Sequence, residues 1–351
     1  MNTTSNPPTH QAEGHTKEQE AFLTCVRTLT LTKTRLKGID DNDFVHLGQR
    51  EIEERFFKWP SFSREKEIKK LIKDGSLIKK KQYNPKSGRM MDMYICLRHG
   101  ALDASLVPVK VPVYGKTQSF MLECLKNTVL EPGTPTTMYF DFFIQSRDQY
   151  PNLFFKFDSF SGRCHTPVTS LPGSIRENLL LYGKPVVSLD VSQMQPQILG
   201  VVLKDQIKEN QFSTWMDSRA DVYRMIAGRY GLDTRAEGKK RFFEILFGRA
   251  NDELAVIFGE ADWITWINRY KRRKNTGNPH MHKLHSNLAW LLQKKEVEIM
   301  KTVWIDLTAA NIPFLTVHDE IICSRENKEA ATKIFKEKLE QHFVHFQLNV
   351  S

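Results

Sequence analysis

The chain has 351 residues, with 51 Lys and Arg against 41 Asp and Glu, which gives a formal net charge of +10 at pH 7. A hydrophobic share of 40% and a charged share of 26% are typical of a globular protein with room for two or three modules. The basic excess favours a polyanionic partner such as nucleic acid, although charge alone is equally consistent with simple solubility. No apolar run is long enough to span a bilayer, so we expect no membrane association.

Cysteine usage and the N-terminal composition point to a reducing environment. The five cysteines include no CxxC pair, which argues against a disulfide framework and against a cysteine zinc site. Residues 1–14 lack the basic-then-apolar pattern of a signal peptide. We therefore expect a cytoplasmic protein in which residues 1–40 form a polar tail and a short helix.

Residues 41–100 have the pattern of a winged-helix-like, nucleic-acid-binding module. A helical period runs from Phe44 to Phe57, and a second helix is predicted from Ser63 to about Lys73. Two strand-like runs, Leu77–Tyr83 and Met90–Leu97, flank a turn-rich linker. The hairpin carries Lys79, Lys80 and Lys81, which suit contact with phosphates. The alternative is a solvated hairpin that docks a protein.

Residues 101–160 form a connector, with a helix predicted over Gln118–Asn127 and a loop over Glu131–Pro135. Beyond it, Pro185–Leu189 is β-prone and ends at Asp190, and a helical run follows from Gln197 to Lys204. An acid at the end of a central strand is held on rigid backbone. The alternative is an ordinary helix-capping aspartate.

A predicted helix near the middle of the chain repeats cations and then rings at intervals of four residues. These residues are Arg235, Lys239, Phe243 and Phe247. Each step of four advances about 40° on a helix, so the four side chains form one slanted stripe. Cations followed by rings match a nucleotide, in which a triphosphate is joined to a flat base, and Gly248 leaves room for a template strand. The alternative is an amphipathic helix whose rings lie in a core.

Basic and aromatic residues alternate over residues 263–274, where Arg272 and Arg273 are candidates for contact with a single-stranded template. A solvated helix end is the alternative. A helix is predicted from Leu292 to about Ala309 and a final one from Glu326 to Phe343.

A hairpin of Pro313–Val317 and Ile321–Ser324 is predicted to carry His318, Asp319 and Glu320 at or beside its turn. Asp190 and Asp319 could then meet on neighbouring strands, where they would repel each other unless cations neutralise them. Two Mg²⁺ ions about 3.5–4 Å apart, with Mn²⁺ as a substitute, would do so and would suit nucleotidyl transfer.

These segments together resemble the family A nucleic-acid polymerases. Ser188–Gln195 is similar to motif A, Arg235–Gly248 to motif B and Thr316–Glu320 to motif C, and the resemblance covers roughly residues 160 to 325. It implies an α+β right-hand polymerase over residues 161–351, with fingers at about 216–285 inserted in a palm. Residues 101–160 would then be a connector or reduced thumb, and the winged-helix-like module would precede the core.

The resemblance also implies roles for single residues. Asp190 and Asp319 would hold the metal ions with Glu320 assisting, Arg235, Lys239, Phe243, Phe247 and Gln195 would bind the nucleoside triphosphate, and Arg163, Gln293, His318 and Gly248 would contact primer or template. One departure concerns sugar choice, because Gln195 stands where DNA polymerases of this family usually carry Glu. Gln195 is still bulky, which favours deoxynucleotides.

The expected function is DNA-dependent DNA synthesis without proofreading, acting in the replication of a mobile element such as a phage or plasmid. Its partners would be a DNA template and primer, with RNA as the alternative nucleic acid. The rival enzyme is a primase or single-subunit RNA polymerase using the same residues. A second rival is an inactive palm that serves only to bind nucleic acid.

Overall fold

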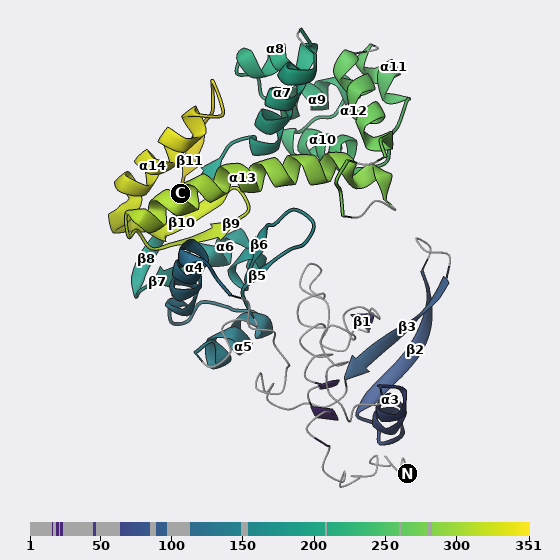
Figure 1. Cartoon of the computed structure of the whole chain (residues 1–351), viewed down its shortest axis with the longest axis vertical. Helices are drawn as coiled ribbons and strands as arrows, with labels where there is room; N and C mark the ends of the chain where they lie inside the picture. The colour runs from purple at the N-terminus through teal and green to yellow at the C-terminus, as the bar shows by residue number, and fades with distance from the viewer. Residues whose placement is uncertain are drawn as a thin grey trace, which may run out of the picture. The chain divides into compact units, whose positions relative to one another are not determined.

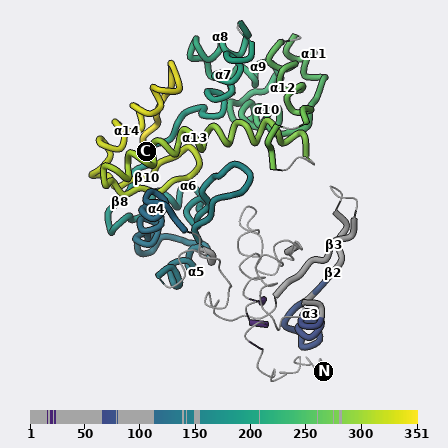
Figure 2. Tube along the Cα trace, viewed as in Figure 1, coloured from purple at the N-terminus to yellow at the C-terminus, as the bar shows by residue number. Residues whose placement is uncertain are grey.

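The structure is a computed structural model that describes residues 16, 19–20, 22–23, 45–46, 64–84, 89–96, 113–148, 154–207, 209–259, 261–274, 276–279 and 283–351 (Figures 1 and 2). The chain divides into two compact units. One comprises Met1–Val113 and Thr136–Phe154, and the other comprises Tyr114–Pro135 and Phe155–Ser351. The predicted connector, residues 101–160, is therefore shared between the two units.

The first unit contains α3 (Arg64–Lys73), β2 (Leu77–Asn84), β3 (Arg89–Cys96), β1 (Val45–His46) and α5 (Met138–Ser146). The predicted second helix and the hairpin are confirmed. The helix predicted from Phe44 is wrong at Val45–His46, which pair with β3 as an added strand because backbone pairing overrides a weak helical period. The rest of that prediction, and the polar tail, lie outside the described residues.

The three lysines predicted to contact phosphates lie on β2. In the register of the hairpin, Lys79 pairs with Tyr94, Lys80 with Met93 and Lys81 with Asp92. The side chains of Lys80 and Lys81 lie outside what the structure describes, so their contact with phosphates stays a prediction.

The second unit is built on an antiparallel sheet. Its strands are β4 (Thr128–Leu130), β7 (Leu179–Leu181), β8 (Lys184–Val191), β10 (Glu320–Ser324), β9 (Phe314–Val317) and β11 (Leu348–Val350). The order is β4-β7-β8-β10-β9, and β11 adds to β8. A separate hairpin joins β5 (Lys156–Phe157) to β6 (Cys164–His165). The two central strands bury Leu189 and Ile321, both 0% exposed.

Helices cover this sheet and form a cluster beyond it. They are α4 (Lys116–Lys126), α6 (Gly173–Arg176), α7 (Met194–Gln206), α8 (Gln211–Asp217), α9 (Val222–Tyr230), α10 (Arg235–Phe247), α11 (Leu254–Phe258), α12 (Asp262–Arg272), α13 (Asn287–Ala309) and α14 (Lys328–Glu340). Along α13, contacts pass from α12 and α10 to α7 and α14, so this long helix joins the cluster to the sheet (Figure 1).

Sequence and local structure agree at most of these elements. The predicted helix at 118–127 and the hairpin around residues 318–319 are confirmed. Helix α7 begins at Met194, earlier than predicted, because Pro196 lies in the first turn, where its missing N–H removes no helical hydrogen bond. The architecture is mixed α+β, as expected.

Two further expectations concern the environment of the chain. Cys124, Cys164 and Cys323 are buried free thiols. Within the described ranges, no helix combines the length and the apolar character needed to cross a membrane.

Candidate functional site

Three acids meet at the junction of β8 and β10. Asp190 is the direct cross-strand partner of Glu320, and Val317 pairs with Glu320 across the two-residue turn that holds His318 and Asp319. Directly opposed residues of antiparallel strands have Cα atoms about 4.5–5.5 Å apart, with side chains on one face. His318 takes a left-handed φ of 59°, as the first residue of such a tight turn requires. The structure thus brings Asp190, Asp319 and Glu320 together.

Burial and like charge make these acids costly to ionise. Burial raises the pKa of Asp319, and the nearby carboxylates of Glu296 and Asp190 raise it further. Burial also raises the pKa of Asp190, against a hydrogen bond from Asn349 and the positive charges of Lys239 and Arg176. Such a group of poorly compensated carboxylates has the electrostatics of a cation site.

Glu320 is held by two partners of its own. Its Oε1 accepts from the Ser188 hydroxyl at 2.6 Å, and its Oε2 pairs with Arg176 Nη2 at 3.0 Å. The three side chains line a cavity of about 560 Å³ together with Asp190 and Arg325. Because both oxygens of Glu320 already have partners, its geometry suits support of this wall of the cavity better than direct coordination of a metal.

The carboxylates of Asp190 and Asp319 would supply part of a magnesium coordination shell. Among the described residues, no three His, Cys, Asp or Glu side chains are grouped so as to hold a metal ion. Mg²⁺ commonly takes one or two carboxylates and completes its shell with water and substrate phosphates. Asp190 and Asp319 could supply that sparse set of ligands.

The cations of α10 stand on an anchored helix end. Thr234 caps α10, and Glu237 completes a capping box. Arg235 Nε donates to Asp221 Oδ2 at 2.6 Å, and its guanidinium lies 4.8 Å from the ring centre of Tyr223. Lys239 Nζ lies 5.8 Å from the same ring. Both cations remain exposed, so their charges are available to a ligand.

Electrostatic interactions connect this helix with the acids. The positive charge of Lys239 opposes the rise that burial causes in the pKa of Asp190. Burial raises the pKa of Tyr223, and the charge of Asp319 raises it further. Lys239 and Tyr223 therefore lie within electrostatic range of the acids.

Four apolar side chains in the second half of α10 divide into a buried pair and a partly exposed pair. Phe242 and Leu246 are 0% exposed and belong to the core. Phe243 and Phe247 are only partly buried, with ring centres 5.3 Å apart. The core alternative therefore accounts for the first pair, whereas the second pair keeps ring surface that could meet a base or sugar.

The glycines of α10 have structural roles. Gly248 ends the helix, and an added Cβ would lie 2.5 Å from the Glu244 carbonyl oxygen. Gly238 lies against α9, where a Cβ would lie 1.9 Å from the Tyr223 carbonyl oxygen. Close packing of α9 and α10 thus needs glycine at 238, which keeps Tyr223 beside the cations.

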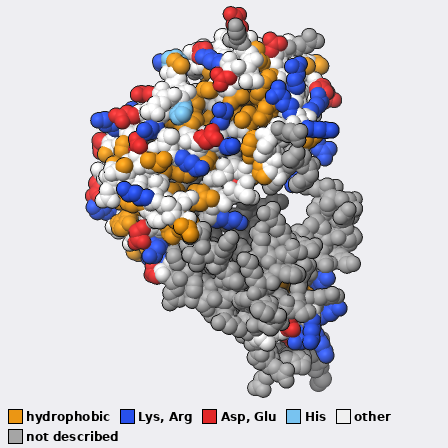
Figure 3. Space-filling model, viewed as in Figure 1, with side chains coloured by type: hydrophobic (Ala, Val, Ile, Leu, Met, Phe, Trp, Pro, Cys, Tyr) orange, Lys and Arg blue, Asp and Glu red, His pale blue; other side chains and the backbone are white. Residues whose placement is uncertain are grey.

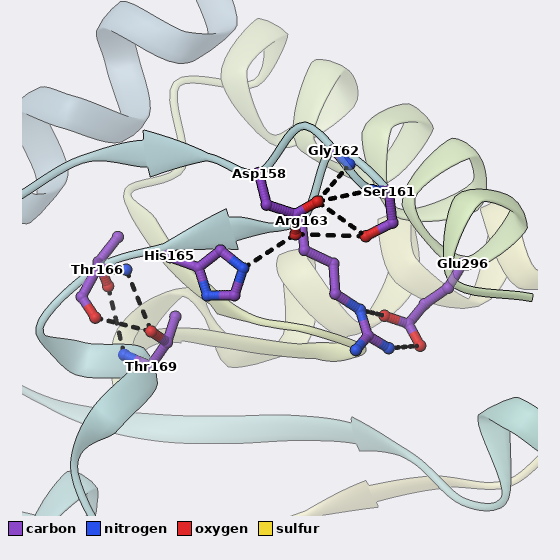
Figure 4. A network of polar contacts seen from close by, with 8 residues as sticks. All are labelled: Asp158, Ser161, Gly162, Arg163, His165, Thr166, Thr169 and Glu296. Carbon is purple, nitrogen blue, oxygen red and sulfur yellow. Dashed lines mark hydrogen bonds and ion pairs between the residues drawn. The ribbon is translucent and has the colours of Figure 1, made fainter. Parts of the chain in front are cut away.

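Arg163 is part of a buried charge network (Figure 4). Its Nε and Nη2 donate to the two carboxylate oxygens of Glu296 at 2.8 and 2.7 Å. Gln195 Nε2 donates to the same carboxylate from α7. Gln293 lies one turn before Glu296 on α13 and is partly buried. Arg163 was predicted to contact the primer and Gln195 to bind the nucleotide. Both side chains donate hydrogen bonds to the carboxylate of Glu296.

His318 lies against the β5–β6 hairpin. Its ring centre is 6.1 Å from that of His165, whose Nε2 lies 3.0 Å from Asp158 Oδ2. Burial lowers the pKa of His318 to about 4, and the positive charge of Arg163 contributes. His318 is therefore neutral near pH 7.

The basic segment around α12 is more buried than its sequence suggests. Trp263 and Lys271 are 0% and 1% exposed, so neither can meet a template base. Lys271 Nζ donates to the Ile245 carbonyl of α10, and burial lowers the pKa of Lys271 to about 8. Arg272 and Arg273 line a surface cavity of about 500 Å³, on a face where basic side chains gather over α11 and α12 (Figure 3). Arg272 also pairs with Asp252 at 2.6 Å.

Four supporting residues were not predicted. They are Arg176, Asp221, Tyr223 and Asn349, which orient or neutralise the predicted residues. Each lies far in sequence from the group that it contacts, or on a separate helix, so spacing within a motif carries no signal for them.

Comparison of the chain with protein-family models and with curated proteins finds no match.

Proposed function

We propose that the chain is a template-directed nucleotidyltransferase, specifically a DNA-dependent DNA polymerase with a family A-like palm and fingers. The observation that carries the proposal is the cross-strand register that sets Asp190 beside Glu320 and Asp319, with Lys239 close enough to influence Asp190. A sheet that presents acids within electrostatic range of an exposed cation has the charge distribution that a nucleoside triphosphate and divalent ions require.

The acids have a defined share in the reaction. Asp190 and Asp319 would hold two Mg²⁺ ions, which supply activation of the primer 3′-hydroxyl and stabilisation of the departing pyrophosphate. Strand β8 holds Asp190, the tight turn between β9 and β10 holds Asp319, and Ser188 and Arg176 hold Glu320 beside them. This rigidity keeps the reacting groups in position, which is where much of the rate enhancement of such a transfer originates.

The α10 stripe would bind the incoming nucleotide. Arg235 and Lys239 stabilise the charge of the triphosphate, and the partly exposed rings of Phe243 and Phe247 contact base and sugar. Asp221 and Tyr223 hold the two cations in place before the nucleotide arrives.

The remaining candidates would bind the nucleic acid. Arg163, Gln293 and His318, around the β5–β6 hairpin and α13, would contact the primer, and Arg272 and Arg273 would contact the template. In the first unit, we propose that β1, α3, β2 and β3 form a winged-helix-like module that contacts phosphates through β2. Such a compact enzyme suits replication of a mobile element.

A primer-extension assay on a recessed-3′ DNA duplex tests the proposal. We expect extension with four dNTPs in the presence of Mg²⁺, and none when a chelator removes the metal. A parallel reaction on unprimed single-stranded DNA with four rNTPs tests the primase alternative. Synthesis only in the unprimed reaction would replace the proposal with a primase, and no product under any of these conditions would contradict both.

A further inference from the structure

The buried carboxylate of Glu296 is the centre of a cluster drawn from three separate segments. Its residue is 1% exposed, on α13. Arg163 reaches it from the β5–β6 hairpin with two hydrogen bonds, and Gln195 reaches it from the first turn of α7. A paired, bidentate Arg–carboxylate contact fixes the plane of the guanidinium, so Glu296 sets the direction in which Arg163 points.

Glu296 also fixes the amide of Gln195. The Gln195 carbonyl oxygen is buried, and among the described residues no group donates a hydrogen bond to it, while the amide nitrogen donates to the carboxylate. Turning the amide over would set its oxygen against the negative charge of Glu296. Glu296 therefore sets the orientation of the amide. Leaving the buried carbonyl oxygen without a hydrogen bond costs about 1–3 kcal/mol of stability.

This arrangement explains why position 195 carries an amide rather than an acid. A glutamate there would place a second carboxylate in contact with Glu296, and two buried like charges would disfavour ionisation of either. The acid of the cluster stands instead at position 296, where it meets Arg163 directly.

The guanidinium of Arg163 has a second edge, which carries Nη1. The Nε and Nη2 edge is taken by Glu296, and among the described residues no hydrogen bond engages Nη1. The side chain keeps 17% of its surface exposed. A guanidinium held by one edge can offer the other to a phosphate.

We infer that Glu296 is a positioning residue that holds Arg163 so that its Nη1 edge binds a phosphate of the primer strand, while it keeps Gln195 in place at the nucleotide. The inference rests on the proposed function. Its rival is that Glu296 sequesters Arg163 and competes with phosphate for it.

Glu296→Gln separates these two ideas, with Glu298→Gln as the matched control. Glu298 is exposed on the same helix, and either change removes one negative charge. Loss of a negative charge by itself strengthens binding to a polyanion. If Glu296 positions Arg163, we expect Glu296→Gln to weaken binding of a recessed-3′ DNA duplex about 10-fold in fluorescence anisotropy at fixed salt. Glu298→Gln should bind as tightly as the wild type or slightly tighter.

Steady-state kinetics distinguish a positioning role of Glu296 from a purely structural one, because a purely structural role would not change the KM for the duplex selectively. Glu296→Gln should raise the KM for the primer–template duplex much more than the KM for the nucleotide, because the new amide keeps an oxygen that can accept from Gln195 but loses the charge that pairs with Arg163. Equal or tighter duplex binding by Glu296→Gln than by Glu298→Gln would overturn the inference. So would a rise confined to the nucleotide KM.

A second variant covers the case in which Glu296→Gln does not fold. Glu296→Asp keeps the negative charge, so the variant should fold. Because its side chain is one methylene shorter, it should hold Arg163 less well and bind the duplex at least about threefold more weakly than the wild type. Unchanged binding by this folded variant would overturn the inference. If the wild type binds the duplex but incorporates no nucleotide, the proposed function fails while these binding measurements still decide the role of Glu296; no duplex binding by the wild type would overturn both.

Discussion

The acids on β8 and β10 and the cations on α10 are held in opposite ways. Asp190 and Glu320 stand opposite each other in the register of a buried sheet. Arg235 and Lys239 are exposed; Arg235 is held by Asp221, and both cations lie near the ring of Tyr223. The acids are thus fixed and costly to ionise, whereas the cations can adjust to a ligand. The difference suits a site that holds metal ions rigidly and lets nucleotides enter and leave.

The largest expected effect on stability concerns Gly238, where the cationic helix α10 packs closely against α9. Gly238→Ala would press a methyl group into the Tyr223 carbonyl, so α9 and α10 must separate. We expect a loss of about 3 kcal/mol in the free energy of unfolding, measured by urea denaturation. Gly228→Ala is the control, because a Cβ at this exposed position of α9 meets nothing within 4 Å. That variant should be slightly more stable than the wild type. Equal stability of the two variants would mean that the helices do not need close approach.

The next effect concerns the cations. Lys239→Met should raise the KM for the nucleotide about 10- to 100-fold, since a hydrogen bond to a charged group contributes roughly 1.5–3 kcal/mol. Steady-state incorporation kinetics measure it. The neighbouring Lys240→Met variant also loses one exposed charge, but it lies outside the stripe and should leave the KM almost unchanged. An equal effect of the two substitutions would show that only net charge matters.

A smaller effect concerns Asp319, whose ionisation should lower the stability of the folded protein as pH rises. The folded pKa of Asp319 is raised, so the native state binds its proton more tightly than the unfolded chain does. Stability therefore falls as pH rises from the ordinary carboxyl pKa towards the raised value. Asp319→Asn removes this loss, so the variant should become more stable than the wild type by about 1–2 kcal/mol at pH 8 and by almost nothing at pH 4.

Thermal unfolding without divalent ions at the two pH values measures this difference. Added Mg²⁺ should stabilise the wild type more than Asp319→Asn and so narrow the gap at pH 8. A gap that does not change with pH would mean that the ionisation of Asp319 does not oppose folding.

Periodicity and turn chemistry made much of this arrangement predictable. The strand ending at Asp190, the hairpin turn at His318 and Asp319, and the helix beginning at Arg235 all follow from local patterns of apolar, β-branched and capping residues. The division of the rings on α10 into buried Phe242 and half-exposed Phe243 did not follow, because it depends on which neighbours pack against the helix.

Long-range partners account for the rest of what sequence could not supply. Glu296 lies on α13, yet its carboxylate joins side chains from the β5–β6 hairpin and from α7. Lys271 belonged to a basic run that suited a template, but it is buried against the Ile245 carbonyl. The added strand at Val45–His46 likewise depends on pairing with β3. Contacts between distant segments decide such cases, and spacing within one segment does not record them.

Single-nucleotide incorporation by Asp190→Asn and Asp319→Asn tests the central claim most directly. Each variant keeps the size of the side chain and removes one proposed metal ligand, so each should lose at least about 10³-fold in rate with Mg²⁺ while still binding the primer–template duplex. Asp205→Asn, at an exposed position near the end of α7, should retain the wild-type rate. Rates for the two site variants that match that of Asp205→Asn would contradict the account.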